Sequence, residues 1–287
     1  MSSLHYLDWI VLLGTLLFIV IYGTLKTRKN KNLNAYLKGD NSLGWATIGL
    51  SVMATQASAI TFISTPGQAY ESGMGFVQNY FGLPLALIVV SAFFIPIYYR
   101  LKVYTAYEYL ENRFNKRTRL LTASLFLIQR GLAAGITIYA PAIILSSVLN
   151  WDLTLTIFFV GVLVIIYTVS GGTKAVSITQ KYQMGIIFLG MFIAFFTILN
   201  KLPEGVGFAN ALSISGSMGM LDSINFSFEL KERYTFWSGI TGGFFLALSY
   251  FGTDQSQVQR YLSGKNIKES RMGLMFNAVV KIPMQYF

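Results

Sequence analysis

The sequence contains no cysteine and only one histidine, His5. The absence of cysteine excludes disulfide bridges and thiolate metal sites, and a single histidine does not build a metal site by itself, so we expect His5 to be an ordinary surface residue. A glycine-rich phosphate loop, paired carboxylates within one helical turn and a Ser/His/Asp set are also missing, and we therefore do not expect an enzyme. Charged residues make up only 12% of the chain, against 54% hydrophobic residues, which excludes a water-soluble surface.

Long apolar segments recur along the whole chain instead. A bilayer core of roughly 30 Å is crossed by about 20 apolar residues in a helix, and the segments have about this length. The first of them, 7–25, lacks the basic flank and the cleavage site of a signal peptide, so we expect it to remain as a helix. We predict a single transmembrane domain over 1–287 with about eight segments, the last of them incomplete: 7–25, 44–63, 76–99, 120–149, 153–169, 182–199, 236–251 and 272–287.

Positive charge is distributed unevenly between the loops. Of the 22 Lys and Arg residues, 17 fall in alternate loops such as 26–38 and 100–119, three fall in the loops between them, and two lie inside apolar segments. The positive-inside rule places the richer loops in the cytoplasm, which predicts a multi-pass protein of the plasma (inner) membrane with its N-terminus outside. The same rule explains the net charge of +10 without a nucleic-acid partner, so the expected partners are the lipid bilayer and small solutes.

Two apolar segments are rich in small and hydroxyl residues, which is unusual for helices that face lipid. The segment 44–63 carries Ala-Thr-Gln-Ala-Ser-Ala at 54–59, and the segment 236–251 carries Gly239, Gly242 and Gly243. Such residues either let a neighbouring helix approach closely or mark a break where backbone carbonyls coordinate an ion. Composition alone favours close packing for the first segment. Because the second lies five segments later, however, we predict a pair of interrupted helices in two inverted repeats.

Arg130 and Lys281 lie inside apolar segments. An ionised side chain at the centre of a bilayer costs at least about 2.5–3.5 kcal/mol and usually faces a cavity. Each of the two has either a functional role, in which it binds a solute, or a structural one. In the structural role it bonds a backbone carbonyl or extends to the membrane interface, and the sequence leaves both roles open. Asp254, just after the segment 236–251, is expected to form an interfacial ion pair with Arg260.

Five motifs occur in order: LSVMATQASAITF with TPGQAY (50–70), TAYEYLENRF (105–114), IYAPA (138–142), GGTKAV (171–176) and GTDQSQVQRY (252–261). Together they resemble the sodium/solute symporter family, in particular its branch of iodide, monocarboxylate, multivitamin and sialic acid carriers. The resemblance implies an all-α polytopic membrane protein with an inverted-repeat core of five plus five helices, preceded by one helix and truncated in the second repeat. It implies sodium-coupled symport of a small organic solute by alternating access, with sodium as the coupling ion and no cofactor. The alternative is a membrane sensory domain of the same fold that heads a signalling protein.

The same resemblance assigns residues to a site. Sodium is expected where the first core helix unwinds, at the backbone carbonyls of Ala54 and Ala57. Ser58 and Thr61 match positions that contact sialic acid in its carrier, and Tyr250 matches an aromatic inner gate of the sugar carriers. The complete set expected to bind substrate is Gln56, Ser58, Thr61, Tyr80, Arg130, Tyr250 and Lys281.

Departures from the family pattern bear on the solute and on the stoichiometry. Polar contacts of the sugar carriers fall on residues such as Tyr80 here, which disfavours a hexose, although Lys281 matches a lysine in a sugar carrier's site. The arginine that receives the carboxylate in the sialic acid carrier falls on Ala133; our hypothesis is that Arg130, one helical turn earlier, replaces it in binding a carboxylate-bearing anion. An aspartate associated with a second sodium site is replaced by Gln180, which predicts one coupled sodium ion.

Overall fold

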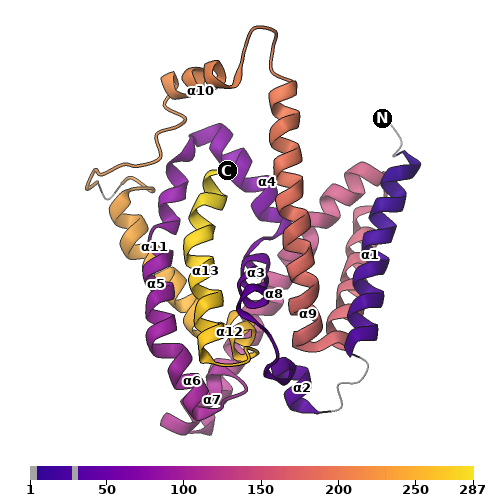
Figure 1. Cartoon of the computed structure of the whole chain (residues 1–287), viewed down its shortest axis with the longest axis vertical. Coiled ribbons are helices and arrows are strands. Elements are labelled where there is room, and N and C mark those ends of the chain that lie inside the picture. Colours follow the sequence, from indigo (N-terminus) through magenta and orange to yellow (C-terminus); the bar gives the residue numbers. More distant parts are fainter. Residues whose placement is uncertain (1–4, 28–31, 230) are drawn as a thin grey trace.

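The computed structural model describes residues 5–27, 32–229 and 231–287 of the chain. Helices account for nearly all of the regular structure in these ranges, where the one β-type contact is an isolated bridge between Leu43 and Gly264. Most of the long helices run roughly along one axis and pack side by side (Figure 1). The predicted all-α fold is therefore confirmed.

Helix α1 (Tyr6–Thr27) packs along α9 (Leu153–Asn200). Gly172 interrupts α9, because its φ of 59° and ψ of −174° suit glycine, and a Cβ atom here would lie 2.9 Å from the carbonyl oxygen of Tyr36. Helix α9 is thus two helices that meet at Gly172. The predicted apolar segments 153–169 and 182–199 leave residues 170–181 between them. The structure makes this stretch helical as well, because the helix resumes directly after the glycine.

The second predicted segment is broken in the middle. It forms α3 (Trp45–Gln56) and α4 (Ala59–Ser72), with Ala57 and Ser58 extended at φ/ψ of −86°/94° and −100°/165°. Ser58 begins the second helix as its N-cap, since its hydroxyl oxygen accepts a hydrogen bond from the backbone N–H of Thr61 at 3.4 Å. The predicted interruption of this helix is confirmed.

The break in the other interrupted segment lies elsewhere than expected. Helix α11 (Phe236–Thr253) runs without interruption through its glycines and ends at Asp254, whose ψ of 117° separates it from α12 (Gln255–Leu262). The glycines serve close packing instead: a Cβ atom at Gly239 would lie 2.7 Å from the carbonyl carbon of Gln78. The prediction of a break among the glycines was wrong, because here they allow another backbone to approach.

One long rod of helix lies beside α11, and it contains a π-helical segment. It consists of η2 (Met74–Tyr80), α5 (Leu83–Val89), the π-helical η3 (Val90–Phe94) and α6 (Ile95–Leu101). A π turn leaves a carbonyl without its usual helical donor. In η3 the carbonyl oxygen of Ser91 accepts a hydrogen bond from Arg271 Nε at 2.8 Å. The π segment is thereby tied to the start of α13 (Ile267–Tyr286).

The core lies where α13 packs against α3 and α5. Ile48, Leu87 and Leu274, one from each helix, are fully buried there. Gly273 lets the backbones of α13 and α3 approach, because a Cβ atom at this position would lie 2.9 Å from the carbonyl oxygen of Trp45. The other elements are α2 (Leu33–Lys38), η1 (Gly39–Asn41), α7 (Ala106–Arg113), α8 (Lys116–Leu149) and α10 (Phe208–Ser217).

Three helices in the described ranges are long and apolar enough to cross a membrane, judged by length and composition. Their large apolar side chains point outward: Leu127 is 68% exposed and Ile165, on the neighbouring shorter helix, is 60% exposed. This is the surface expected of helices that contact lipid. The number of eight segments remains a prediction. The three spans are Met74–Leu101, Lys116–Leu149 and Gly172–Asn200, and the shorter apolar helix is Leu153–Ile166.

Candidate solute and sodium site

The α3–α4 break brings oxygen atoms together. The Thr61 hydroxyl donates to the carbonyl oxygen of Gln56 at 3.4 Å and lies 3.4 Å from the hydroxyl of Ser58. The N–H of Ala57 bonds the carbonyl oxygen of Ala54 at 3.2 Å, which leaves that oxygen one of its two lone pairs. Unwound carbonyls beside hydroxyl groups are the ligands with which broken helices hold sodium. The arrangement fits the predicted sodium role of Ala54 and Ala57, which stays a prediction.

Lys281 lies on the inner face of α13 and is buried, with only 2% of its surface exposed. Its Nζ atom lies 5.6 Å from the ring centroid of Tyr80, so the structure brings together two residues of the predicted substrate set. In the part of the chain that the structure describes, no Asp or Glu carboxylate lies within ion-pair distance of it. A buried cation that has an aromatic face but no anion is incompletely compensated.

Two further polar residues follow the same face of α13 at helical spacing. Asn277 is fully buried, and among the described residues neither its Nδ2 nor its Oδ1 atom has a hydrogen-bond partner; the Oε1 atom of Gln285 also has none there. Buried polar atoms without a partner are rare in folded proteins, so these side chains are candidates for binding a polar solute. Sequence analysis missed Asn277 and Gln285. The signal was available, since these residues and Lys281 follow one another at intervals of four.

Residues next to Lys281 on α13 pack close to the start of the α3–α4 break. Met284, three residues beyond Lys281, belongs to a small buried cluster with Met53 and Met184, and Ala54 packs against that cluster. The residues predicted for sodium and for solute therefore lie at similar depth on the facing helices α3 and α13.

Arg130 on α8 forms an ion pair with Asp254 at the α11–α12 break. Its guanidinium carbon also lies 5.5 Å from the ring centroid of Tyr250, another residue of the predicted substrate set. The expected pair of Asp254 with Arg260 was wrong, because α12 directs Arg260 towards Ser177 on α9, where Nη1 and the hydroxyl oxygen are 3.4 Å apart. A solute carboxylate at Arg130 has to compete with Asp254. The solute-binding role of Arg130 stays a hypothesis.

Hydrogen bonds fix Asp254 and the end of α11 just before it. Its Oδ1 atom accepts hydrogen bonds from the N–H and hydroxyl of Ser256 at 2.9 and 2.6 Å. The last carbonyls of α11 are capped by hydroxyl groups: Tyr98 donates to the carbonyl oxygen of Gly252 at 2.6 Å, and Tyr261 donates to that of Phe251. These caps satisfy carbonyls that a broken helix leaves unpaired.

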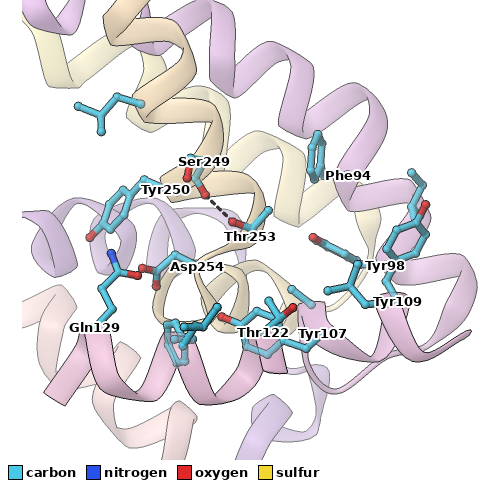
Figure 2. A pocket seen from close by; sticks show the side chains of 16 residues that line it. Phe94, Tyr98, Tyr107, Tyr109, Thr122, Gln129, Ser249, Tyr250, Thr253 and Asp254 are labelled. Carbon is cyan, nitrogen blue, oxygen red and sulfur yellow. Dashed lines mark hydrogen bonds between the residues drawn. The ribbon is translucent and has the colours of Figure 1, made fainter. Parts of the chain in front are cut away.

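A cavity of about 580 Å³ opens beside this break, between α6, α7, α8 and α11 (Figure 2). Tyr250, Asp254 and Gln129 lie along one side of it, and Tyr98 and Tyr107 lie on the other. Tyr250 accepts a hydrogen bond from Gln257 Nε2 at 2.7 Å through its hydroxyl oxygen. Tyr250, which was predicted to be an inner gate, therefore lines a cavity.

Gln180 occupies the position where the family pattern has an aspartate. Its Oε1 atom accepts hydrogen bonds from the hydroxyl of Ser51 at 2.6 Å and from that of Thr55 at 3.4 Å. A neutral amide thus ties α9 to α3 one turn before the break. An amide oxygen is a weaker ligand for a cation than a carboxylate because it carries no net charge.

The Arg130–Asp254 pair gives a testable expectation. Arg130→Met and Asp254→Asn should each destabilise the full-length protein by about 1–3 kcal/mol, because each removes one member of the ion pair and leaves the charge of the other uncompensated. The double variant should lose less than the sum of the two, as measured by unfolding in detergent. Purely additive losses would contradict the pairing. Loss of carboxylate binding in Arg130→Met but not in Asp254→Asn would instead favour direct contact of Arg130 with solute.

The fold and the site define a class of protein: a polytopic all-α membrane protein with the architecture of a sodium-coupled symporter. The family model "Sodium:solute symporter family" matches residues 36–285. The chain therefore belongs to the sodium:solute symporter family.

Individual relatives agree with this assignment. The human sodium-coupled monocarboxylate transporter 2 is 32% identical over 260 residues, which cover 90% of this chain and 41% of the relative. The human sodium/iodide cotransporter is 32% identical over 248 residues, which cover 85% and 38%. A solved structure of a Na⁺-coupled sialic acid symporter in a substrate-bound outward-open state has a TM-score of 0.88 and 28% identity, and the match covers 97% of this chain and 58% of that one. The chain spans less than half the length of these curated relatives.

Proposed function

We propose that the protein carries out sodium-coupled symport of a small organic solute by alternating access. The break at Ala57 and Ser58, together with a buried Lys281 on the facing helix α13 that has no anionic partner among the described residues, is the observation that carries this proposal. It offers oxygen ligands for a cation and a fixed positive charge for a solute on facing helices. Membership of the family supports the same function. Nothing in the fold or the comparisons favours the alternative of a signalling protein.

The proposed solute is a small carboxylate-bearing anion. Lys281 supplies an ammonium group in a buried setting, and Tyr80 supplies an aromatic face beside it. A carboxylate at this position would compensate the charge of Lys281 with charge-assisted hydrogen bonds. Ser58 and Thr61 add hydroxyl groups at the break. Two of the relatives named above transport anions according to their names, a monocarboxylate and iodide.

One coupled sodium ion is the second part of the proposal, since Gln180 brings no negative charge to the α9–α3 contact. Symport of a monovalent anion with one sodium ion is electroneutral, so a membrane potential, which acts at about 2.3 kcal/mol per charge per 100 mV, does not drive it. A tenfold sodium gradient supplies about 1.4 kcal/mol and limits accumulation of the anion to about tenfold.

Uptake into proteoliposomes that contain the full-length protein tests the proposal. The panel comprises radiolabelled monocarboxylates, sialic acid and hexoses, with and without an inward sodium gradient. We expect a monocarboxylate to enter only with sodium, with a Hill coefficient for sodium of about 1 and no response to an imposed potential. Specific binding without any uptake would overturn transport. Preferred uptake of a hexose would overturn the solute class, and stimulation by an inside-negative potential would overturn the stoichiometry.

A further inference from the structure

Another cavity, of about 410 Å³, is lined by residues of α2, α6 and α12 and of the connections beside them. Figure 1 shows these three helices in the lower part of the molecule. Cavities that bind small molecules have volumes of about 300–1,000 Å³. None of the residues predicted to bind sodium or solute lines this cavity. Its polar walls come from three connections that are far apart in the sequence, and include Asn34, Lys38, Asn41, Lys102, Tyr104 and Lys265.

Three lysines converge on this cavity, and no Asp or Glu of the described residues lines it. Lys38 is 9% exposed; its Nζ atom donates to the carbonyl oxygen of Lys102 at 3.1 Å and lies 4.3 Å from the ring centroid of Tyr104. An ammonium group has three donors, so further donors of Lys38 are available to a ligand. Lys102 and Lys265 are exposed at the rim. The cavity therefore combines one buried and two accessible cations.

The acidic residue that attracts the charge of Lys38 is Glu108, whose carboxylate already has other partners. Its Oε2 atom accepts the N–H of Tyr104 at 2.9 Å, and its Oε1 atom lies 3.8 Å from Arg119 Nη2. Burial lowers the pKa of Lys38, and the attraction of Glu108 only partly offsets this effect. An anion in the cavity would supply the compensation that the protein itself provides incompletely.

The backbone that forms this wall is strained. Gly39, Asp40 and Asn41 are consecutive left-handed residues with φ of 54°, 56° and 49°, and Lys102 across the cavity has φ of 53°. Lys102, which is the C-cap of α6, pays about 1–2 kcal/mol for this conformation, whereas Asp and Asn adopt it more readily than other non-glycine residues. Such strain is maintained only where the surroundings over-determine it, which includes ligand sites. Here the amide of Asn41 is fixed by a 2.8 Å bond from Nδ2 to the carbonyl oxygen of Leu262.

We propose that this cavity binds a phosphate-bearing anion, supplied either by the headgroup of an anionic phospholipid or by a soluble phosphate compound. Lysine ammonium groups bind phosphate as point charges. The side-chain amides of Asn34 and Asn41 can form hydrogen bonds with hydroxyl groups of the molecule that carries the phosphate. Basic pockets on the cytoplasmic side of membrane helices are suited to such headgroups. The positive-inside rule accounts for lysines in loops. It does not account for a buried Lys38 that shares one cavity with Lys102 and Lys265.

The test uses the purified full-length protein in detergent and its melting temperature as the readout. The probes are dioctanoyl phosphatidylglycerol, dioctanoyl phosphatidylcholine and glycerol 3-phosphate, because a ligand that binds the folded state raises the melting temperature with concentration. In the triple variant Lys38→Met, Lys102→Met, Lys265→Met we expect the dissociation constant of the bound probe to rise by roughly 100-fold, since each lysine contributes about 1 kcal/mol. Phosphatidylcholine, which has no net charge, should bind weakly to both proteins.

A matched triple variant separates the cavity from general positive charge. Lys116→Met, Lys181→Met, Lys268→Met removes the same charge from exposed positions outside the cavity and should keep the wild-type dissociation constant. Binding of phosphatidylglycerol alone assigns the site to lipid, and binding of glycerol 3-phosphate as well assigns it to soluble phosphates. If no anionic probe binds, or if both triple variants weaken binding equally, the proposal is wrong. Should the first triple variant not fold, Lys102→Met with Lys265→Met, both exposed, gives the same comparison against Lys116→Met with Lys268→Met.

Discussion

Replacing Lys281 with methionine should strongly reduce sodium-driven solute uptake while making the protein more stable to unfolding. Methionine has a similar length and no charge, so the variant removes a buried, incompletely compensated cation and leaves the packing of α13 largely intact. The loss of a charge-assisted hydrogen bond to a carboxylate costs about 1.5–3 kcal/mol, which lowers solute affinity roughly 10- to 100-fold. Radiolabelled uptake and thermal unfolding of the same preparation measure both effects.

The opposite signs of these two effects make the prediction specific. A residue with a purely structural role would lose stability and uptake together. Lys231→Met, at an exposed position in the loop before α11, is the matched control and should change neither quantity. If Lys281→Met retains wild-type affinity for the carboxylate, Lys281 does not bind the solute, and the anion proposal loses its main support.

Gly239→Ala and Gly243→Ala should each destabilise the protein strongly, whereas Gly242→Ala should not. A Cβ atom at Gly239 would overlap the carbonyl group of Gln78, and one at Gly243 would lie 3.3 Å from the carbonyl carbon of Asn79 and closer still to its oxygen. Backbone atoms cannot move aside as a flexible side chain can. We expect losses of at least about 1–3 kcal/mol for these two variants.

Gly242 provides an internal control on the same helix. A Cβ atom there meets nothing within 4 Å, so alanine only reduces the flexibility of the unfolded chain. A gain of about 0.5–1 kcal/mol is therefore expected. Unfolding in detergent of the three single variants checks the contrast. Equal effects at the three positions would contradict the close packing of α11 against η2.

Helix positions and the first break could be predicted from the sequence because their causes are local. Apolar runs of membrane length fix the helices, and Ser58 provides a local cap just after the break. The glycines of α11 are different. A helix break and a close helix contact have the same composition, so only the neighbouring backbone decides between them, and in the case of Gly239 this is Gln78, 161 residues earlier (239 − 78).

The polar partners of the site could not be predicted for a related reason. Asp254 could pair with Arg130, 124 residues away, or with Arg260 in the next helix. The path of α12 after the break determines the partner, because it directs Arg260 to Ser177. The importance of Asn277 depends on its burial, which follows from how α13 meets α3 and α5. Spacing along α13 identifies the face, but only the packed structure shows that its amide atoms lack partners.

The ion pair between α8 and the α11–α12 break has an electrical consequence. A rearrangement that carries Arg130 and Asp254 together moves no net charge, and therefore does no work against the membrane potential, whereas separating them across the field does. Each full charge that crosses a potential of 100 mV changes the energy by about 2.3 kcal/mol. Lys281, which has no such partner among the described residues, carries its whole charge with α13. Voltage therefore acts on this part of the molecule chiefly through Lys281, until an anion neutralises it.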